Sequence, residues 1–319
     1  MKIKQFSHTD LDGVGSYVVL KSALPADKHE VSITYCDYHK IDEKVVNFTK
    51  SEDFNSYDFI VITDISVNEE TAIILDEIHK SEQGPTIQLL DHHGTAEWLN
   101  KYEWAHVDQN HQGHPGHKSS GTSLVVDFLD TNWPELEAEL THGVRHFAET
   151  VRRYDTWEWA RFYNEILPKE LNDYLYMTSR EEFANLMIEI IPSNKPGEEV
   201  YFDTRARALL DQKQKEIEAY IKKKSKQLIK TDYKEGVVAG VVFADQHVSE
   251  LGNELCKQNE DIDFVIMIDM GERKLSFRTA KDDVDVSEIA KTYGGGGHPK
   301  ASGAQFSEED IHGFLSRIL

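Results

Sequence analysis

Short apolar runs alternate with longer segments of mixed polarity in the first part of the chain. Strands are predicted for four of these runs: KIKQF, VSITYC, FIVIT and TIQLL. The segments between them repeat apolar residues at helical spacing, as in NEETAIILDEIHK. Strands separated by helices predict a mostly parallel sheet covered on both faces, and the expected fold class is therefore α/β.

A second alternating pattern follows a long, mainly helical region. The segment 119–190 is predicted to be helical, and PSNKPGEEV at 192–200 indicates a break between domains. A charged helical pattern follows, and a new strand begins at VVAGVVFA. We therefore expect an N-terminal domain over 1–195, a helical linker over 196–234 and a smaller α/β domain over 235–319.

The composition of the chain narrows the range of molecules that it is expected to bind. The 319 residues carry a net charge of -22, which argues against a broad basic surface for long nucleic acid. No apolar run approaches the length of about 18–20 residues that a membrane span needs. Cys36 and Cys256 are too few for a disulfide framework and are expected to be buried thiols, which suits a cytoplasmic protein.

Acidic and histidine residues recur where the predicted strands end. They are His8, Asp10 and Asp12 after the first strand, Asp64 after FIVIT, and Asp91, His92 and His93 after TIQLL. The carboxyl ends of parallel strands meet at one edge of the sheet, where ligands bind in such folds. Five of these side chains are therefore expected to converge: Asp10, Asp12, Asp64, His92 and His93.

Converging carboxylates repel one another unless cations neutralise them. A set of Asp and His without thiolates suits Mn²⁺ or Mg²⁺, with Zn²⁺ or Fe as alternatives. The set is larger than one ion needs, so the sequence predicts two ions bridged by one carboxylate. A polar turn at residues 8–13 is the alternative, and the two interpretations are compatible because Gly13 permits a tight turn beside the ions.

The ordered motifs DLDGVGS, TDIS, DHHGT, RRYDTWEW and GGGGHPKASG resemble those of the DHH phosphoesterase superfamily with its DHHA1 C-terminal domain. Within it, SHTDLDGVGS, SELGN and YGGGGHPKASG are most similar to the oligoribonuclease (nanoRNase) B group. The resemblance implies an N-terminal parallel-sheet DHH domain and a smaller α/β DHHA1 domain, with the active site in the cleft between the domains.

The resemblance also implies roles for individual residues. It makes Asp10 and Asp12 ligands of different ions, Asp64 the bridging carboxylate, and His92 a ligand of the second ion. It makes Asp155 the last acidic ligand, a role that its surroundings alone do not indicate. His93 matches the histidine beside the metals that contacts the phosphate or supports the ligands, so Asp64 and His93 are the expected catalytic residues.

One position departs from many relatives, which carry a histidine ligand four residues before the first Asp of the motif. Phe6 occupies that position here, and His8 lies two residues closer. His8 is therefore expected either to bind the first ion or to support its ligands.

The C-terminal glycine run exposes backbone N–H groups that can hold an anion, although a flexible turn is the simpler interpretation. The resemblance implies that it holds the phosphate or terminal nucleotide of the substrate. The residues expected to do so are Arg278, Gly295, Gly296, Gly297 and His298.

The expected function is that of a Mn²⁺-dependent phosphodiesterase that hydrolyses very short RNA to nucleoside monophosphates, acting alone or as a homodimer. Enzymes acting on cyclic dinucleotides, 3′-phosphoadenosine 5′-phosphate, single-stranded DNA or pyrophosphate are alternatives. The glycine motif and Phe6 disfavour pyrophosphatase. A metal-binding regulatory protein without activity is an alternative of another class.

Overall fold

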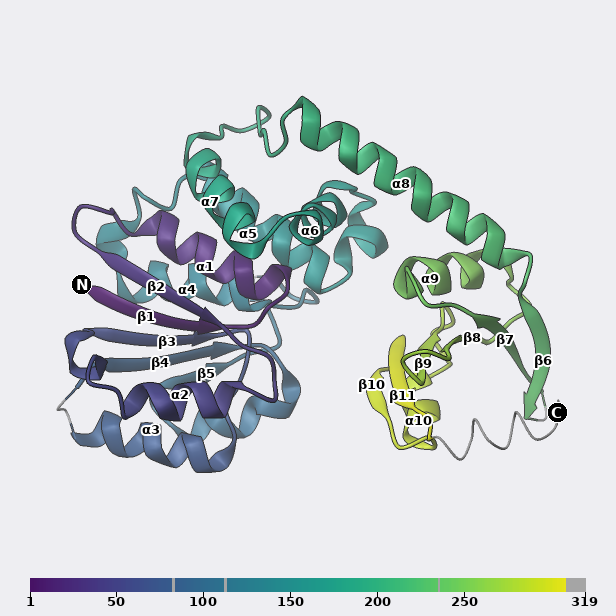
Figure 1. Ribbon diagram of the computed structural model, residues 1–319, viewed down its shortest axis with the longest axis horizontal. Helices are drawn as coiled ribbons and strands as arrows, with labels where there is room; N and C mark the ends of the chain where they lie inside the picture. The colour runs from purple at the N-terminus through teal and green to yellow at the C-terminus, as the bar shows by residue number, and fades with distance from the viewer. Residues whose placement is uncertain (82–83, 112–113, 235, 308–319) are drawn as a thin grey trace. The chain divides into compact units, whose positions relative to one another are not determined.

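A five-stranded, fully parallel sheet organises the N-terminal part of the chain (Figure 1). The computed structural model describes residues 1–81, 84–111, 114–234 and 236–307. The strand order is β2-β1-β3-β4-β5. The strands are β1 (Lys2–Ser7), β2 (Glu30–Tyr35), β3 (Phe59–Thr63), β4 (Thr86–Asp91) and β5 (Ala105–Val107). The prediction of an α/β fold with a parallel sheet is confirmed.

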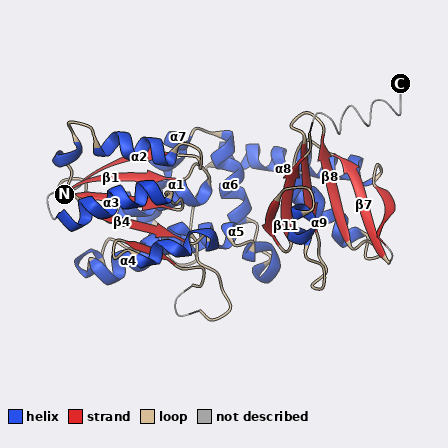
Figure 2. Cartoon of the chain, turned by 90° about the horizontal axis from the view of Figure 1, so that it is seen from below, coloured by secondary structure: helices blue, strands red, loops and turns tan. Residues whose placement is uncertain are grey.

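Helices cover both faces of this sheet, drawn red between blue helices in Figure 2. One face packs against α1 (Leu11–Ala23), α4 (Gly121–Asn132), α5 (His142–Asp155), α6 (Leu167–Met177) and α7 (Arg180–Ile190). The other packs against α2 (Ile41–Thr49), α3 (Glu69–Ser81) and the 3₁₀ helix Gly94–Lys101. Shorter helical turns lie at Phe54–Ser56, Pro134–Leu136, Trp159–Tyr163 and Ile191–Ser193.

Strand β3 shows why the sequence forms this layered core. Val61 packs into the cluster with α1, whereas Ile60 and Ile62 pack into the cluster with α2 and α3. All five residues of β3 are buried, as expected for a parallel strand covered on both faces.

The chain separates into two compact units, Met1–Leu210 and Asp211–Leu319, and the boundary falls inside α8 (Thr204–Ser225). The second unit contains a six-stranded sheet of order β10-β11-β9-β8-β7-β6, in which β7 and β8 form the parallel pair. Its strands are β6 (Ile229–Lys234), β7 (Val237–Phe243), β8 (Phe264–Asp269), β9 (Lys274–Arg278), β10 (Gly296–His298) and β11 (Ala301–Gln305).

Each face of the second sheet is covered by a helix. α9 (Val248–Gln258) packs with Val265 and Met267, and α10 (Val286–Lys291) packs with Phe264 and Phe277 on the opposite face. None of the described helices is long and apolar enough to cross a lipid bilayer. Both cysteines are free and buried.

The helical linker expected over 196–234 needs correction at its C-terminal end. The helix ends at Ser225, and Ile229–Lys234 forms β6, which pairs antiparallel with β7. The physical reason lies in the alternating Ile229, Thr231 and Tyr233, residue types that favour strands. Tyr233 also packs its ring edge-on to Phe264, with centroids 5.2 Å apart.

Candidate metal centre and phosphate-binding site

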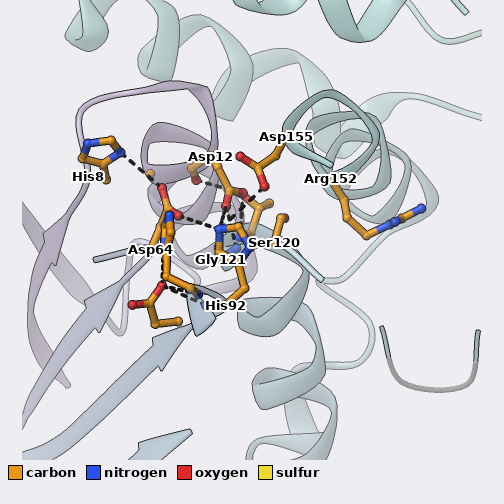
Figure 3. Close-up of polar contacts among 12 residues, drawn as sticks. His8, Asp12, Asp64, His92, Ser120, Gly121, Arg152 and Asp155 are labelled. Carbon is orange, nitrogen blue, oxygen red and sulfur yellow. Dashed lines mark hydrogen bonds and ion pairs between the residues drawn. The ribbon is translucent and has the colours of Figure 1, made fainter. Parts of the chain in front are cut away.

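Polar side chains from three central strands gather at the carboxyl edge of the parallel sheet. His8 and Asp10 follow β1, Asp64 follows β3, and His92 follows β4. Two further acids come from helices: Asp12 from the first turn of α1 and Asp155 from the end of α5. Figure 3 shows His8, Asp12, Asp64, His92 and Asp155 directed toward one another.

Two groups of side chains that could each hold a metal ion share no residue. One contains His8, Asp10 and Asp64, and the other contains Asp12, His92 and Asp155. A third group, Asp64, Asp91, His92 and His93, overlaps both. Within each group, the candidate ligand atoms lie within 4.8 Å of one another. The structure therefore places His8 with the candidate ligands of the first group, which is one of the two expectations for this residue.

Asp64 lies between the two groups. Its Oδ1 is 3.2 Å from Nε2 of His92, and its Oδ2 is 3.7 Å from Nδ1 of His8. One carboxylate thus directs one oxygen to each group, the arrangement that a ligand shared by two ions requires.

The backbone around Asp64 is unusual. Asp64 has a φ of 57°, a left-handed conformation that Asp tolerates better than most residues. Gly121 packs directly against it, and a Cβ atom at position 121 would lie 2.5 Å from Cβ of Asp64. The position of this carboxylate therefore depends on glycine at 121.

Two buried atoms of the first group lack hydrogen-bond partners: Oδ2 of Asp64 and Nδ1 of His8. Nδ1 of His8 lies 2.9 Å from Oδ2 of Asp10, yet the pair does not have the geometry of a hydrogen bond. Leaving such atoms unpaired costs free energy, and ligation of a cation would remove that cost. The oxygen and imidazole donors suit Mn²⁺ or Mg²⁺, so these residues fit a divalent metal centre.

The electrostatics of the cluster also favour a cation. Burial, together with Asp12 and Asp10, raises the pKa of Asp64 well above its usual range. Burial likewise raises the pKa of Asp155 to about 7, with His92 opposing the shift and Asp12 adding to it. Burial and the neighbouring acids thus both disfavour the ionised carboxyl groups, and a divalent cation would favour the ionised form.

Helix α4 holds Asp12 by its N-terminus. Oδ2 of Asp12 accepts a hydrogen bond of 2.5 Å from the Gly121 backbone N–H, and Oδ1 accepts one of 2.9 Å from Thr122. The partial positive charge of a helix N-terminus stabilises a carboxylate at this position. Figure 3 shows Gly121 beside Asp12. Backbone hydrogen bonds at the N-terminus of α4 therefore fix the orientation of the Asp12 carboxylate.

A buried ion pair fixes the segment before α4. Arg152, 1% exposed, donates a hydrogen bond of 2.8 Å to the carbonyl oxygen of Lys118, and Glu158 accepts one of 3.0 Å from the Lys118 N–H. Arg152 and Glu158 also pair with each other at 3.0 Å. This pair was not predicted from the sequence, although both residues flank Asp155 within the motif RRYDTWEW.

Asp91 orients His93. The His93 imidazole donates from Nδ1 to Oδ1 of Asp91 across 2.7 Å, and Asp91 is buried. Burial alone would lower the pKa of His93, but the bond to Asp91 outweighs it and raises the pKa to about 9. Asp91 was expected at a strand end but without a role in the site. Its position directly before His92 and His93 was the available signal.

In the second unit, pairing across three strands aligns Arg278 with His298. Arg278 on β9 pairs with Ala301 on β11, and Ala301 pairs with His298 on β10. Directly paired residues direct their side chains to the same face of a sheet, so Arg278 and His298 share a face with a small residue between them. Arg278 also donates to Oγ of Ser249 on α9 across 3.0 Å.

The glycines before His298 differ in their structural role. A Cβ at Gly295 would lie 2.1 Å from the carbonyl oxygen of Gly303, and Gly297 has a φ of 138°. Both positions therefore require glycine for the pairing of β10 with β11. Gly296 is exposed and has open space where a Cβ would lie, so packing does not require glycine there.

Comparison with known proteins agrees with the motifs and the fold. The model of the DHHA1 domain matches residues 234–319. Oligoribonuclease NrnB from Bacillus subtilis (strain 168) is 39% identical over 316 residues, which cover 98% of this chain and 75% of that protein.

Two solved structures share the fold at low sequence identity. RecJ from Thermus thermophilus, in complex with Mn²⁺, aligns with a TM-score of 0.61 at 14% identity and covers 99% of this chain and 51% of RecJ. The pGpG-specific phosphodiesterase PggH from Vibrio cholerae aligns with a TM-score of 0.55 at 13% identity, covering 99% of this chain and 97% of PggH. The chain therefore belongs to the DHH/DHHA1 phosphoesterase superfamily, in the group of oligoribonuclease NrnB, and is a hydrolase of phosphodiester bonds.

Proposed function

We propose that the protein is a Mn²⁺-dependent exoribonuclease that degrades very short RNA oligonucleotides to nucleoside monophosphates. The observation that carries this proposal is the position of Asp64, with one carboxylate oxygen toward His92 and the other toward His8. Similarity to a protein named oligoribonuclease supports the choice of substrate.

Two ions are assigned to the two groups of ligands. His8, Asp10 and Asp64 would hold the first ion, and Asp12, His92 and Asp155 would hold the second with Asp64 shared. Bound ions would neutralise the charge of the phosphodiester and lower the pKa of the attacking water. Mn²⁺ is preferred because the donors combine carboxylates with imidazoles, and Mg²⁺ is the alternative.

His93 would contribute a positively charged donor beside the two groups of candidate ligands. Its Nδ1 is committed to Asp91, so Nε2 is the atom left to contact the substrate. A charged donor aimed at a phosphate oxygen stabilises the charge that develops in the transition state. His93 is accordingly proposed as a catalytic residue together with Asp64.

The second unit is proposed to bind the phosphate of the terminal nucleotide. Arg278 and His298 share one face of its sheet, and Gly296 leaves open space at the adjoining backbone. The residues proposed for this role are Arg278, Gly295, Gly296, Gly297 and His298. A small substrate also agrees with the net charge of -22, and the two free cysteines support a reducing compartment such as the cytoplasm.

A turnover panel with Mn²⁺ tests the proposal. RNA dimers through octamers would be compared with cyclic dinucleotides, pGpG, 3′-phosphoadenosine 5′-phosphate and pyrophosphate, with products identified by chromatography. We expect the highest kcat/KM on the shortest RNA, with nucleoside monophosphates as products. A higher kcat/KM on cyclic dinucleotides or 3′-phosphoadenosine 5′-phosphate would contradict the substrate, and a metal-loaded but inactive protein would support the regulatory alternative.

A further inference from the structure

Tyr38 lies at the same sheet edge as the two groups of candidate ligands, although it belongs to none of the motifs. It follows β2, the strand beside β1. Its ring centroid is 4.9 Å from that of His8 and 6.1 Å from that of His93. Tyr38 is 54% exposed, so a substrate arriving from the solvent can reach it.

The hydroxyl of Tyr38 contacts Nε2 of His93, the ring nitrogen that would contact a substrate. The hydroxyl oxygen lies 3.2 Å from Nε2, while Nδ1 of the same ring is bonded to the buried Asp91. Asp91 thus fixes the imidazole from inside, and Tyr38 contacts the nitrogen that remains for a substrate.

This arrangement places two donors around one point. An oxygen that accepts a hydrogen bond from Nε2 of His93 comes within reach of the Tyr38 hydroxyl, since the two donor atoms are only 3.2 Å apart. A phenolic O–H rotates freely and both donates and accepts, so it can turn from the imidazole to a phosphate oxygen.

We propose that Tyr38 is a further catalytic residue, whose hydroxyl donates a hydrogen bond to the same phosphate oxygen that His93 contacts. The inference rests on the proposed function to the extent that a phosphodiester must bind at this edge. It goes beyond that function because it assigns a contact outside the DHH motifs, at the end of a fourth strand.

The test compares Tyr38→Phe with the wild type, using an RNA dinucleotide and bis(p-nitrophenyl) phosphate with Mn²⁺. The substitution keeps the ring and removes only the hydroxyl. We expect kcat/KM to fall about ten- to a hundredfold on both substrates, the range for a hydrogen bond to a charged group. Metal content should be unchanged, and AMP, as a product-like probe, should bind more weakly in calorimetry.

Tyr176→Phe is the matched control. Tyr176 is 67% exposed. Its partial burial and the charge of nearby Asp10 both raise the pKa of its hydroxyl, so Tyr176 lies near the same cluster of acids. No hydrogen bond joins Tyr176 to His93 in the described part of the chain. The control variant should retain the wild-type kcat/KM and the wild-type affinity for AMP.

A double variant separates a direct contact from an indirect one. If Tyr38 contacts phosphate itself, Tyr38→Phe should weaken AMP binding further in a His93→Gln background. Loss of this effect in that background would show that the hydroxyl acts only by holding the imidazole, and the proposal would be wrong. It would also be wrong if Tyr38→Phe matched the wild type while Tyr38→Leu lost activity on RNA, because the ring would then be the contact.

The two proposals fail separately in this design. A wild-type protein that hydrolyses bis(p-nitrophenyl) phosphate but no RNA would contradict the proposed substrate. The generic phosphodiester would still report whether removing the Tyr38 hydroxyl lowers turnover. If the metal-loaded protein turned over neither substrate, the affinity for AMP would decide the inference about Tyr38.

Discussion

Asp64 and His92 face each other at the ends of adjacent strands, with Oδ1 of Asp64 lying 3.2 Å from Nε2 of His92. The other oxygen of the same carboxylate is turned toward His8. A change at Asp64 should therefore affect both groups of ligands at once, whereas a change at Asp155 should affect one.

Asp64→Asn is expected to abolish turnover and to weaken the binding of both metal ions. Asn tolerates the left-handed backbone of this residue, so the variant tests the charge and not the conformation. Metal analysis after dialysis against Mn²⁺ and turnover of an RNA dinucleotide are the measurements. Asp155→Asn is the comparison and should keep the first ion; two ions on Asp64→Asn at wild-type turnover would refute the shared ligand.

Arg152→Ala is expected to destabilise the protein by about 3–5 kcal/mol, because it removes a buried guanidinium that pairs with both Glu158 and Glu149 and leaves the buried Glu158 without this cation. Arg153→Ala is the control, since Arg153 is more exposed, shares Glu149 with Arg152 and otherwise pairs with the exposed Glu165, so its loss should cost only about 0–1 kcal/mol. Urea unfolding of the metal-free proteins measures both changes. Equal losses of stability in the two variants would show that the pair at Glu158 has no special structural role.

Gly295→Ala and Gly296→Ala should separate folding from binding. The first places a Cβ against the Gly303 carbonyl and should lower the thermal stability of the protein, whereas the second meets open space. If this backbone binds phosphate, Gly296→Ala should raise the KM for an RNA dinucleotide without lowering the melting temperature. Unchanged kinetics in Gly296→Ala would argue against phosphate binding at that glycine.

His298→Ala is expected to impair nucleotide substrates selectively. His298 is exposed and belongs to the second unit, whereas the candidate metal ligands found among the described residues all belong to the first, so metal content should remain at the wild-type level. We expect kcat/KM to fall about tenfold on an RNA dinucleotide, the value of one charge-assisted hydrogen bond, and less on bis(p-nitrophenyl) phosphate. Equal losses on both substrates would contradict a separate nucleotide-binding role.

Metal ions should stabilise the protein more strongly as the pH rises. The pKa values of Asp64 and Asp155 are raised in the folded protein by burial and neighbouring acids, that of Asp155 to about 7. Carboxyl groups with raised pKa values favour folding while protonated, and that contribution is lost as the pH rises through about 7. Bound cations favour the charged form of these carboxyl groups and should restore the stability that is lost at higher pH.

The measurement is the difference in melting temperature between Mn²⁺ and EDTA, followed from about pH 5 to about pH 8. This difference should widen with pH in the wild type and widen less in Asp155→Asn. A difference that stays constant over the whole range would exclude the acidic cluster as the place where the metal acts on stability.

Much of the candidate site could be predicted from the sequence, because residues at the carboxyl ends of parallel strands meet at one edge of the sheet. Asp64 comes directly after β3 and His92 directly after β4, and both strands contain apolar runs in the sequence, so a sequence pattern suffices to place them at one edge. Asp155 ends a helix, and only the resemblance to the DHH family singled it out. Tyr38 also follows a strand, but an aromatic residue after a strand carries no metal-binding pattern.

Other features required the three-dimensional structure. Asp91 orients His93 through a hydrogen bond. In the sequence, a carboxylate with this role has the same pattern as a metal ligand. Arg152 and Glu158 act on a segment more than thirty residues away, where both bond the backbone of Lys118. Strand β6 was missed because a helical charge pattern runs up to it without a strong break.

At position 64, the stability of the fold and the proposed catalytic role favour different residues, because the backbone there is left-handed. Glycine adopts this conformation without strain, whereas alanine there costs about 1 kcal/mol, so Asp64→Gly should be more stable than Asp64→Ala. Glycine would also remove a carboxyl group whose pKa is raised by its burial and by repulsion from the neighbouring acids. Laboratory evolution that rewards thermal resistance alone should therefore replace this aspartate with glycine, and retention of the carboxylate in such an experiment would require that the culture depend on the enzyme's activity.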